Sequence, residues 1–210
     1  MSDTKLQIAV LLSGSGTSLE NLLEKIDAGE VPGEVRVVIA SKTKAFGLER
    51  ARRRGIPAVP IPRKQHPDVG EFNDAVHAVL DEYDIDLVLL LGFLSPFETR
   101  GRFEGRTMNV HPALIPAFCG KGYYGHRVHE EVIESGVKLT GATVHFVDAE
   151  YDHGPIILQH TVPVHDDDTA ASLAARVFTA ECEAYPKALQ LLAEGRVQVS
   201  GRRVQILPAG

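Results

Sequence analysis

The stretch Leu6-Gln-Ile-Ala-Val-Leu-Leu-Ser-Gly-Ser-Gly-Thr17 decides the fold class of this chain. Its apolar first seven residues end abruptly at Ser13-Gly-Ser-Gly16, which is typical of a buried strand followed by a tight turn. Residues 17–26 then place apolar side chains at helical spacing, and Thr17 or Ser18 is positioned to cap that helix. The stretch therefore predicts a strand, a glycine-rich turn and a helix.

The same alternation continues along the chain and favours a parallel sheet with helices on both faces. Near the C-terminus two strand-like runs follow one another, and a final hairpin has Ser200-Gly201 at its turn. We expect an α/β, Rossmann-like fold: an open, mostly parallel twisted sheet with antiparallel strands and a hairpin in its C-terminal part. The expected strands are residues 6–12, 34–40, 58–61, 86–91, 107–111, 137–147 and 155–164, and the expected helices are residues 17–26, 45–54, 69–83, 126–135 and 169–193.

Composition narrows the class of protein. The chain has 210 residues, enough for one domain with a substantial core, and it shows no internal repeat or dividing linker. A net charge of −6 without any basic run argues against binding to nucleic acid. Two cysteines and no apolar run of membrane-spanning length lead us to expect a soluble, cytoplasmic protein that uses no membrane.

The stretch Thr107-Met-Asn-Val-His-Pro-Ala-Leu-Ile-Pro116 predicts two polar side chains at the end of a strand. Asn109 and His111 point to the same face because they are two residues apart, and Pro112 ends the strand since it has no amide hydrogen. Ligands bind at the carboxyl ends of strands in open α/β sheets. An amide beside an imidazole suits a reaction that builds negative charge on oxygen and moves a proton. The alternative is that both side chains satisfy backbone groups.

The turn Ser13-Gly-Ser-Gly-Thr-Ser18 is a second candidate site. Its glycines let the backbone approach an anion, and the next helix offers free amides and its positive dipole end. Leu19 stands where a dinucleotide fingerprint has its third glycine, and the Gly-Lys-Ser/Thr ending of a nucleoside-triphosphate loop is missing. A monophosphate site is therefore favoured, and a tight turn that binds nothing is the alternative.

The turn at Asp152 and Gly154 is the third candidate. An acid between two strands is often only a turn residue. If the turn folds back to His111, however, the carboxylate can orient the imidazole and favour its protonated form.

The other histidines suggest no metal site. His66 and His77 are expected on the surface, and His145 is expected to be structural or to line the cleft. His126 and His129 share a helix face, but no third residue has metal-ligand spacing with them. We therefore expect no metal.

Three motifs together resemble the formyltransferase family that uses 10-formyltetrahydrofolate. They are Asn109-Val-His-Pro-Ala-Leu-Ile-Pro116, Gly141-Ala-Thr-Val-His-Phe-Val147 and Asp152-His-Gly-Pro-Ile-Ile157. Each is weak alone, but their order and spacing are specific, and the resemblance runs from Ile8 to about Leu207. It is nearest to the folate-dependent enzymes of purine synthesis, which implies formyl transfer to the amine of glycinamide ribonucleotide by a monomer or homodimer.

The resemblance implies a role for individual residues. The implied catalytic residues are Asn109, His111 and Asp152. The implied binding residues are Gly14, Ser15, Gly16, Thr17 and Glu181 for the ribonucleotide, and Gly92, Phe93, Leu94, Ser95, Phe97, Val144, Asp148 and Tyr151 for the folate. Within a single domain 1–210, residues 1–105 would form the phosphate- and ribonucleotide-binding half and residues 106–210 the catalytic and folate-binding half.

Three segments depart from the family pattern. Leu94-Ser-Pro-Phe97 stands where Met-Arg is frequent, the loop Cys119–Gly125 is longer and richer in glycine than usual, and His153 stands where a small residue is common. Two other functions stay open: hydrolysis of formyltetrahydrofolate, and a non-catalytic nucleotide-binding module. A methionyl-tRNA formyltransferase is disfavoured because the chain is acidic and has no basic C-terminal domain.

Overall fold

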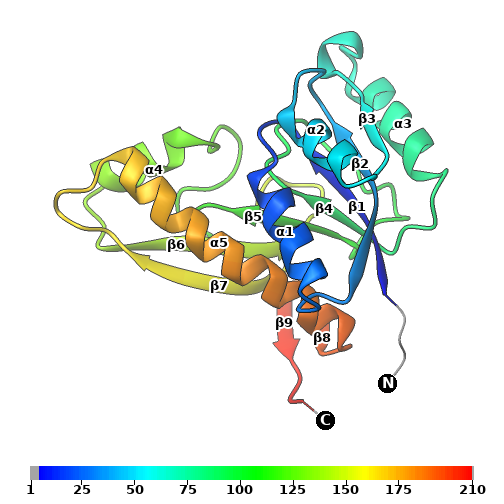
Figure 1. The fold of residues 1–210 in the computed structure, drawn as a ribbon. Coiled ribbons are helices and arrows are strands. Elements are labelled where there is room, and N and C mark those ends of the chain that lie inside the picture. The colour runs from blue at the N-terminus through cyan, green and yellow to red at the C-terminus, as the bar shows by residue number, and fades with distance from the viewer. Residues whose placement is uncertain (1–4, 210) are drawn as a thin grey trace. The chain divides into compact units, whose positions relative to one another are not determined.

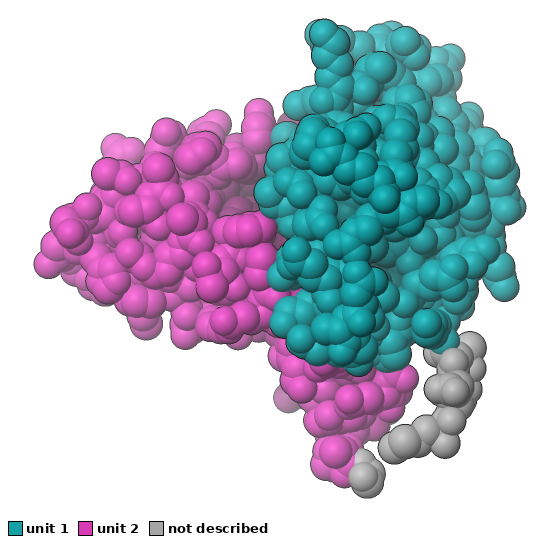
Figure 2. Space-filling view, in the orientation of Figure 1, with its two compact units in different colours: residues 1–108 teal, residues 109–210 magenta. Residues whose placement is uncertain are grey.

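The computed structural model describes residues 5–209 and divides into two compact units, residues 1–108 and residues 109–210 (Figures 1 and 2). The helices are α1 (Thr17–Asp27), α2 (Phe46–Arg53), α3 (Val69–Leu80), α4 (His126–Glu134), α5 (Ala170–Ala193) and the 3-10 helix η1 (Arg63–Gln65). The strands are β1 (Leu6–Leu12), β2 (Gly33–Ala40), β3 (Ala58–Pro60), β4 (Leu87–Leu90), β5 (Thr107–His111), β6 (Leu139–Phe146), β7 (Ile156–Pro163), β8 (Val197–Ser200) and β9 (Arg203–Ile206).

Unit 1 is built on parallel strands in the order β3-β2-β1-β4. Residues 8–12 of β1 and all of β4 are buried, as expected for strands covered on both faces. Because crossovers between parallel strands are right-handed, α1 and α2 lie on one face of this sheet and α3 lies on the other. The strand order reverses between β1 and β4, and the carboxyl ends at such a point form a ligand crevice.

Unit 2 pairs β6 with β7 antiparallel, in the strand order β5-β6-β7. Helices α4 and α5 pack over these strands through one apolar cluster: Val132, Ala142, Val162, Leu173, Val177 and Ala180. A separate hairpin joins β8 to β9. Its turn is Gly201-Arg202, since Ser200 pairs with Arg203, so the expected turn at Ser200-Gly201 is wrong by one residue.

The expected alternation of elements is confirmed, and the boundaries of most helices and strands agree within two or three residues. The capping of α1 differs from the expectation. Gly16, in the left-handed region at φ 73°, takes the N-cap position, and neither Thr17 nor Ser18 caps the helix. Within residues 5–209, none of the helices is both long and apolar enough to span a membrane.

Candidate active site

Three polar side chains of unit 2 meet at the end of β5. His111 Nδ1 lies 3.3 Å from Asp152 Oδ2, and Asn109 Nδ2 lies 3.4 Å from Asp152 Oδ1. Asn109 and His111 share a face because they are two apart in the strand, which ends at His111 just before Pro112. The turn between β6 and β7 supplies Asp152. The structure thus brings together the three residues that the resemblance implies to be catalytic.

The turn that carries Asp152 is held tightly in place. Asp152 adopts φ 54°, a left-handed conformation that aspartate tolerates better than most residues do. A Cβ added at Gly154 would collide with the backbone carbonyl of Phe146, so only glycine permits this close approach. The backbone amide of Gly120 donates a hydrogen bond to Asp152 Oδ2 at 2.9 Å. Contacts with β6 and with the loop before α4 therefore position the carboxylate.

Both ring nitrogens of the buried His111 have partners. Nε2 donates to the backbone carbonyl of Phe118 at 2.8 Å, and Nδ1 faces Asp152. Burial lowers the pKa of His111; the charge of Asp152 and the Phe118 carbonyl act in the opposite direction but do not outweigh burial. For Asp152, burial raises the pKa, but contacts with His145, His111 and Gly120 outweigh it and lower the pKa overall. Burial and the carboxylate therefore act on the pKa of His111 in opposite directions, and the contact of Nδ1 with Asp152 becomes a hydrogen bond only when the ring holds a proton on both nitrogens.

His145, for which the sequence offered no defined role, belongs to the same network. Its Nδ1 donates to the carbonyl of Phe146 at 2.8 Å, so its Nε2 is free to accept from Asn109 Nδ2 at 3.2 Å. The second hydrogen of the Asn109 amide points to Asp152. The signal for this role was present in β6, where Thr143 and His145 are polar residues at alternate positions of an apolar strand.

The glycine-rich turn of unit 1 joins β1 to α1. The backbone amides of Ser15, Gly16, Thr17 and Ser18 donate to no acceptor among the described residues. Free amides at a helix N-terminus attract an anion, and the positive end of the helix dipole adds to that attraction. The turn therefore offers free backbone amides at the N-terminus of α1, where the sequence predicts a phosphate site.

Residues 92–98, which follow β4, are fixed at both ends. Ser13 forms two hydrogen bonds with the start of this segment. Its amide donates to the Gly92 carbonyl at 3.1 Å, and its hydroxyl accepts from the Leu94 amide at 2.8 Å. Asn73 and His77 of α3 bind the far end at Glu98. The expectation that His77 lies on the surface is wrong: its ring is buried against Phe97 and Phe103, and its Nε2 donates to the Glu98 carbonyl at 2.7 Å.

The remaining implied binding residues of unit 2 are in varied surroundings. Val144 is buried, Tyr151 is 54% exposed, and Asp148 pairs with His153 Nδ1 at 2.8 Å. Glu181 of α5 forms no hydrogen bond or ion pair within residues 5–209, and burial raises its pKa to about 8. Within residues 5–209, none of these four side chains forms a hydrogen bond or an ion pair with Asn109, His111 or Asp152.

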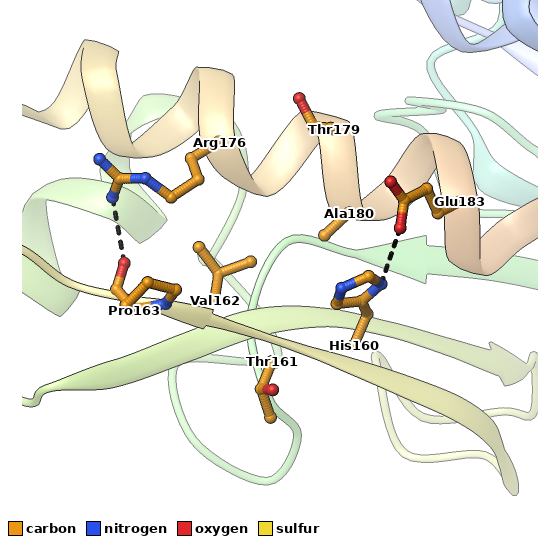
Figure 3. A pocket seen from close by; sticks show the side chains of 8 residues that line it. All are labelled: His160, Thr161, Val162, Pro163, Arg176, Thr179, Ala180 and Glu183. Carbon is orange, nitrogen blue, oxygen red and sulfur yellow. Dashed lines mark hydrogen bonds and ion pairs between the residues drawn. The ribbon is translucent and has the colours of Figure 1, made fainter.

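A hollow of about 270 Å³ between β7 and α5 contains none of the expected site residues (Figure 3). Its polar side chains already have partners: Arg176 bonds to Asp168 and to the Pro163 carbonyl, and His160 Nδ1 lies 3.6 Å from Glu183 Oε2. It is therefore a weaker candidate than the end of β5. Its lining residues are His160, Thr161, Val162, Pro163, Arg176, Thr179, Ala180 and Glu183.

Two other chemistries have little support at this site. Nowhere in the described part of the chain do three or more His, Cys, Asp or Glu side chains gather as a metal site would require. Cys119 lies in the loop near Asp152, and both burial and that carboxylate raise the pKa of its thiol. A raised pKa disfavours the thiolate that nucleophilic catalysis would need.

Comparison with known proteins agrees with this geometry. A family model described as formyl transferase matches residues 6–189. The chain is 41% identical over 199 residues to the trifunctional purine biosynthetic protein adenosine-3 of Homo sapiens, which covers 93% of this chain and only 19% of that protein. It is 36% identical over 197 residues to the phosphoribosylglycinamide formyltransferase of Escherichia coli, covering 92% of this chain and 90% of that protein.

A solved structure is also similar over almost the full length. Glycinamide ribonucleotide transformylase 1 from Symbiobacterium toebii superposes with a TM-score of 0.92 at 41% identity, and the match covers 99% of this chain and 96% of that one. The Rossmann-like fold expected from the sequence is thereby confirmed. Motifs, fold and relatives agree, and the chain belongs to the formyl transferase family.

Proposed function

We propose that this chain transfers the formyl group of 10-formyltetrahydrofolate to the amine of glycinamide ribonucleotide, a step of purine synthesis. The observation that carries the proposal is the meeting of Asn109, His111 and Asp152 at the end of β5. The names of the relatives support the same reaction, and the free amides of residues 15–18 suit the phosphate of a ribonucleotide.

The proposed reaction needs no covalent intermediate on the protein. The substrate amine attacks the formyl carbon, a new carbon–nitrogen bond forms, and negative charge develops on the formyl oxygen. Collapse of this intermediate breaks the bond to the folate N10, which takes up the proton that the amine loses. Amide and imidazole donors stabilise an oxyanion, and removal of one such donor typically lowers the rate about a hundred- to a thousandfold.

The residues at the end of β5 would divide this work. Asn109 gives up the longer of its two hydrogen bonds, the 3.4 Å bond from Nδ2 to Asp152 Oδ1, and donates to the oxyanion instead. His111 carries a hydrogen on Nε2, and Asp152 stabilises the proton that the imidazole holds during its passage from the amine to N10. Because Nε2 now donates to the Phe118 carbonyl, the proposal requires this part of the loop to move away during turnover.

The remaining roles belong to the same proposal. Glu181 would bind the ribonucleotide with Gly14 to Thr17, while residues 92–97 with Val144, Asp148 and Tyr151 would bind the folate. The chain would act in the cytoplasm as a monomer or homodimer, without nucleic acid or membrane. The two cysteines, neither of which forms a disulfide, suit a reducing compartment.

The test follows folate release by absorbance, using purified protein and 10-formyltetrahydrofolate with and without glycinamide ribonucleotide. We expect release only when the ribonucleotide is present, and a fall of at least about a hundredfold in Asn109→Ala and in His111→Ala. Thr161→Ala, on the exposed side of β7 away from these residues, is a control that should keep full activity.

Each other outcome has a distinct meaning. Equal release without the ribonucleotide would reassign the chain to hydrolysis of formyltetrahydrofolate. No release under either condition would leave only the nucleotide-binding module. Full activity in both alanine variants would refute the assignment of the site while leaving the reaction intact.

A further inference from the structure

Three carbonyl groups of the glycine-rich turn accept hydrogen bonds from helices α1 and α2. The Gly14 carbonyl accepts from the Gly47 amide at 3.1 Å, the Ser15 carbonyl accepts from Arg50 Nε at 3.0 Å, and the Gly16 carbonyl accepts from the Glu20 amide at 3.0 Å. A peptide unit that turns its oxygen one way turns the neighbouring amide the other way. Two of these three bonds come from α2, a helix with no residue in the turn itself.

Helix α2 also touches the turn directly. A Cβ added at Gly16 would lie 2.6 Å from the Cα of Gly47, so these two backbones are in close contact. Gly47 is packed from its other side by the buried side chain of Leu12, the last residue of β1. The turn therefore sits between β1 and the first turn of α2, and only glycine fits at either contact point.

Arg50 is the one charged side chain of α2 that binds the turn. Besides Ser15, its guanidinium contacts Glu20 Oε2 at 3.0 Å, and Glu20 is itself shared with Arg54. The Arg50 side chain is only 26% exposed. Arg50 thus joins the carbonyl side of the turn to the first turn of α1 and places a positive charge beneath the free amides.

We propose that Arg50 is a positioning residue for the phosphate of the substrate. Arg50 does not touch the phosphate, but holds the Ser15 carbonyl so that the backbone amides of residues 15–18 face the phosphate. The inference rests on the proposed function for the identity of the substrate. The structural part of the proposal, that α2 determines the shape of the anion site, applies to any small phosphomonoester.

Arg53 provides a matched control on the same helix. Arg50 and Arg53 both lie over the ring of Phe46, at 5.1 and 5.7 Å from its centroid, and both pair with a glutamate. Arg53 differs in that it pairs with Glu49 and makes no bond to the turn. Replacing either one by Met removes the same charge and one ion pair with a glutamate. The two variants differ in the bond to Ser15 and in exposure, since the Arg53 side chain is 66% exposed and that of Arg50 26%.

The experiment compares Arg50→Met, Arg50→Lys and Arg53→Met with the parent chain. Steady-state kinetics would give kcat and both KM values, and calorimetry with ribose 5-phosphate would give the affinity of the site without turnover. A charge-assisted hydrogen bond typically corresponds to a factor of about ten to a hundred. We expect Arg50→Met to raise KM for the ribonucleotide and Kd for ribose 5-phosphate by about this factor, with kcat and KM for the folate within about twofold.

The other two variants complete the test. Arg53→Met should leave every constant within about twofold. Arg50→Lys keeps the charge but loses the planar fork that reaches Ser15 and Glu20 together, so it should recover only part of the affinity. If Arg50→Met and Arg53→Met weaken phosphate binding equally, net charge explains the effect and the proposal is overturned.

The proposal and the proposed function can fail separately. If the parent chain binds ribose 5-phosphate but transfers no formyl group, the proposed function is wrong. The affinities of Arg50→Met and Arg53→Met for ribose 5-phosphate still test the positioning role. If Arg50→Met unfolds, amide exchange in Arg50→Lys replaces it, measured at Gly47 and Glu20, whose amides donate to the Gly14 and Gly16 carbonyls. Unchanged protection of both amides with unchanged affinity would refute the role.

Discussion

At the scale of single residues, the site is defined by how few donors and acceptors are left free. His111 has partners at both ring nitrogens, and both hydrogens of the Asn109 amide point at acceptors. Asp152 takes bonds from Asn109 and Gly120 and faces two imidazoles. Such a network holds each group in one orientation, which is what a preorganised site for proton movement requires.

Asp152→Asn tests the charge of this network while keeping its shape. Asparagine is isosteric and tolerates the left-handed backbone at φ 54°. Without the carboxylate, His111 loses the partner that stabilises its proton, so we expect kcat to fall by about a hundredfold or more in the folate-release assay. Asp166→Asn, which removes a largely exposed carboxylate paired with Lys138, should leave kcat unchanged; an equal loss in both would contradict the role of Asp152.

Glu181→Gln should stabilise the free protein at neutral pH. Burial raises the pKa of Glu181 from 4.5 to about 8, so the folded chain keeps a proton that the unfolded chain loses. The free energy of unfolding contributed by this group therefore falls as the pH rises from about 4.5 to 8. We expect glutamine to raise Tm at pH 7.5 by roughly 2–4 °C for each 1 kcal/mol recovered.

The same variant should bind the ribonucleotide more weakly if Glu181 contacts it. A gain in Tm with unchanged KM for the ribonucleotide would remove Glu181 from the proposed binding residues. A Tm that does not rise at pH 7.5, or that rises equally at pH 4.5, would contradict the raised pKa.

At the scale of elements, α3 determines the shape of the segment after β4. Asn73 Oδ1 accepts from the Glu98 amide at 2.8 Å, and His77 Nε2 donates to the Glu98 carbonyl. The His77 ring also stacks on Phe97, with centroids 5.4 Å apart and planes at 11°. Since Asn73 and His77 are four residues apart, one face of α3 binds both backbone groups of Glu98.

Variants of α3 should loosen this segment without unfolding the helix. Asn73→Leu leaves the Glu98 amide without its acceptor, and the loss of a buried hydrogen-bond partner costs about 1–3 kcal/mol. His77→Phe keeps the stacking on Phe97 and removes only the bond to the carbonyl. We expect faster amide exchange at Glu98 in Asn73→Leu, and in both variants a higher KM for the folate.

Val76→Ala is the matched control for α3. Val76 is fully buried but makes no polar bond to Glu98, so its truncation should lower Tm and leave protection at Glu98 and KM for the folate close to the parent values. If all three variants change Glu98 exchange in proportion to their loss of Tm, the contacts of α3 are merely structural.

At the scale of the whole molecule, buried histidines make the free energy of unfolding depend on pH. His129 of α4 is 5% exposed, and its Nδ1 has no hydrogen-bond partner in the described structure. Burial, followed by the charges of His126 and His111, lowers the pKa of His129 from 6.5 to about 4. Between these two values the unfolded chain binds a proton that the folded chain does not.

The chain should therefore lose stability as the pH falls from about 6.5 to 4. A shift of this size corresponds to about 3 kcal/mol for His129 alone, since one pKa unit is about 1.4 kcal/mol. In His129→Phe, which keeps a ring in the apolar face of α4, we expect the unfolding free energy from urea titrations to vary less with pH in this window. Parallel curves for the variant and the parent would contradict this prediction.

The sequence indicated most of the fold because its signals are local. Apolar runs of strand length, helical spacing and the turn Ser13–Gly16 depend only on neighbouring residues. They predicted the α-helices and the strands closely, but not the 3-10 helix η1. The predictions were wrong where a contact between residues distant in sequence overrode a local preference. Thr17 and Ser18 do not cap α1 because Gly16 takes the N-cap position in a left-handed conformation, against Gly47.

By itself the sequence determined the family, the order of the elements and the pair Asn109 and His111 at the end of β5, because motif spacing and side-chain periodicity need no knowledge of distant contacts. Only the tertiary structure decided which groups surround those residues. His145 joins Asn109, Arg50 binds the turn at Ser15, and His77 is buried against Glu98, each across 20 or more residues of chain. Hydrogen bonds and desolvation depend on distance in space, and folding alone brings such residues to hydrogen-bond distances of 2.7–3.2 Å.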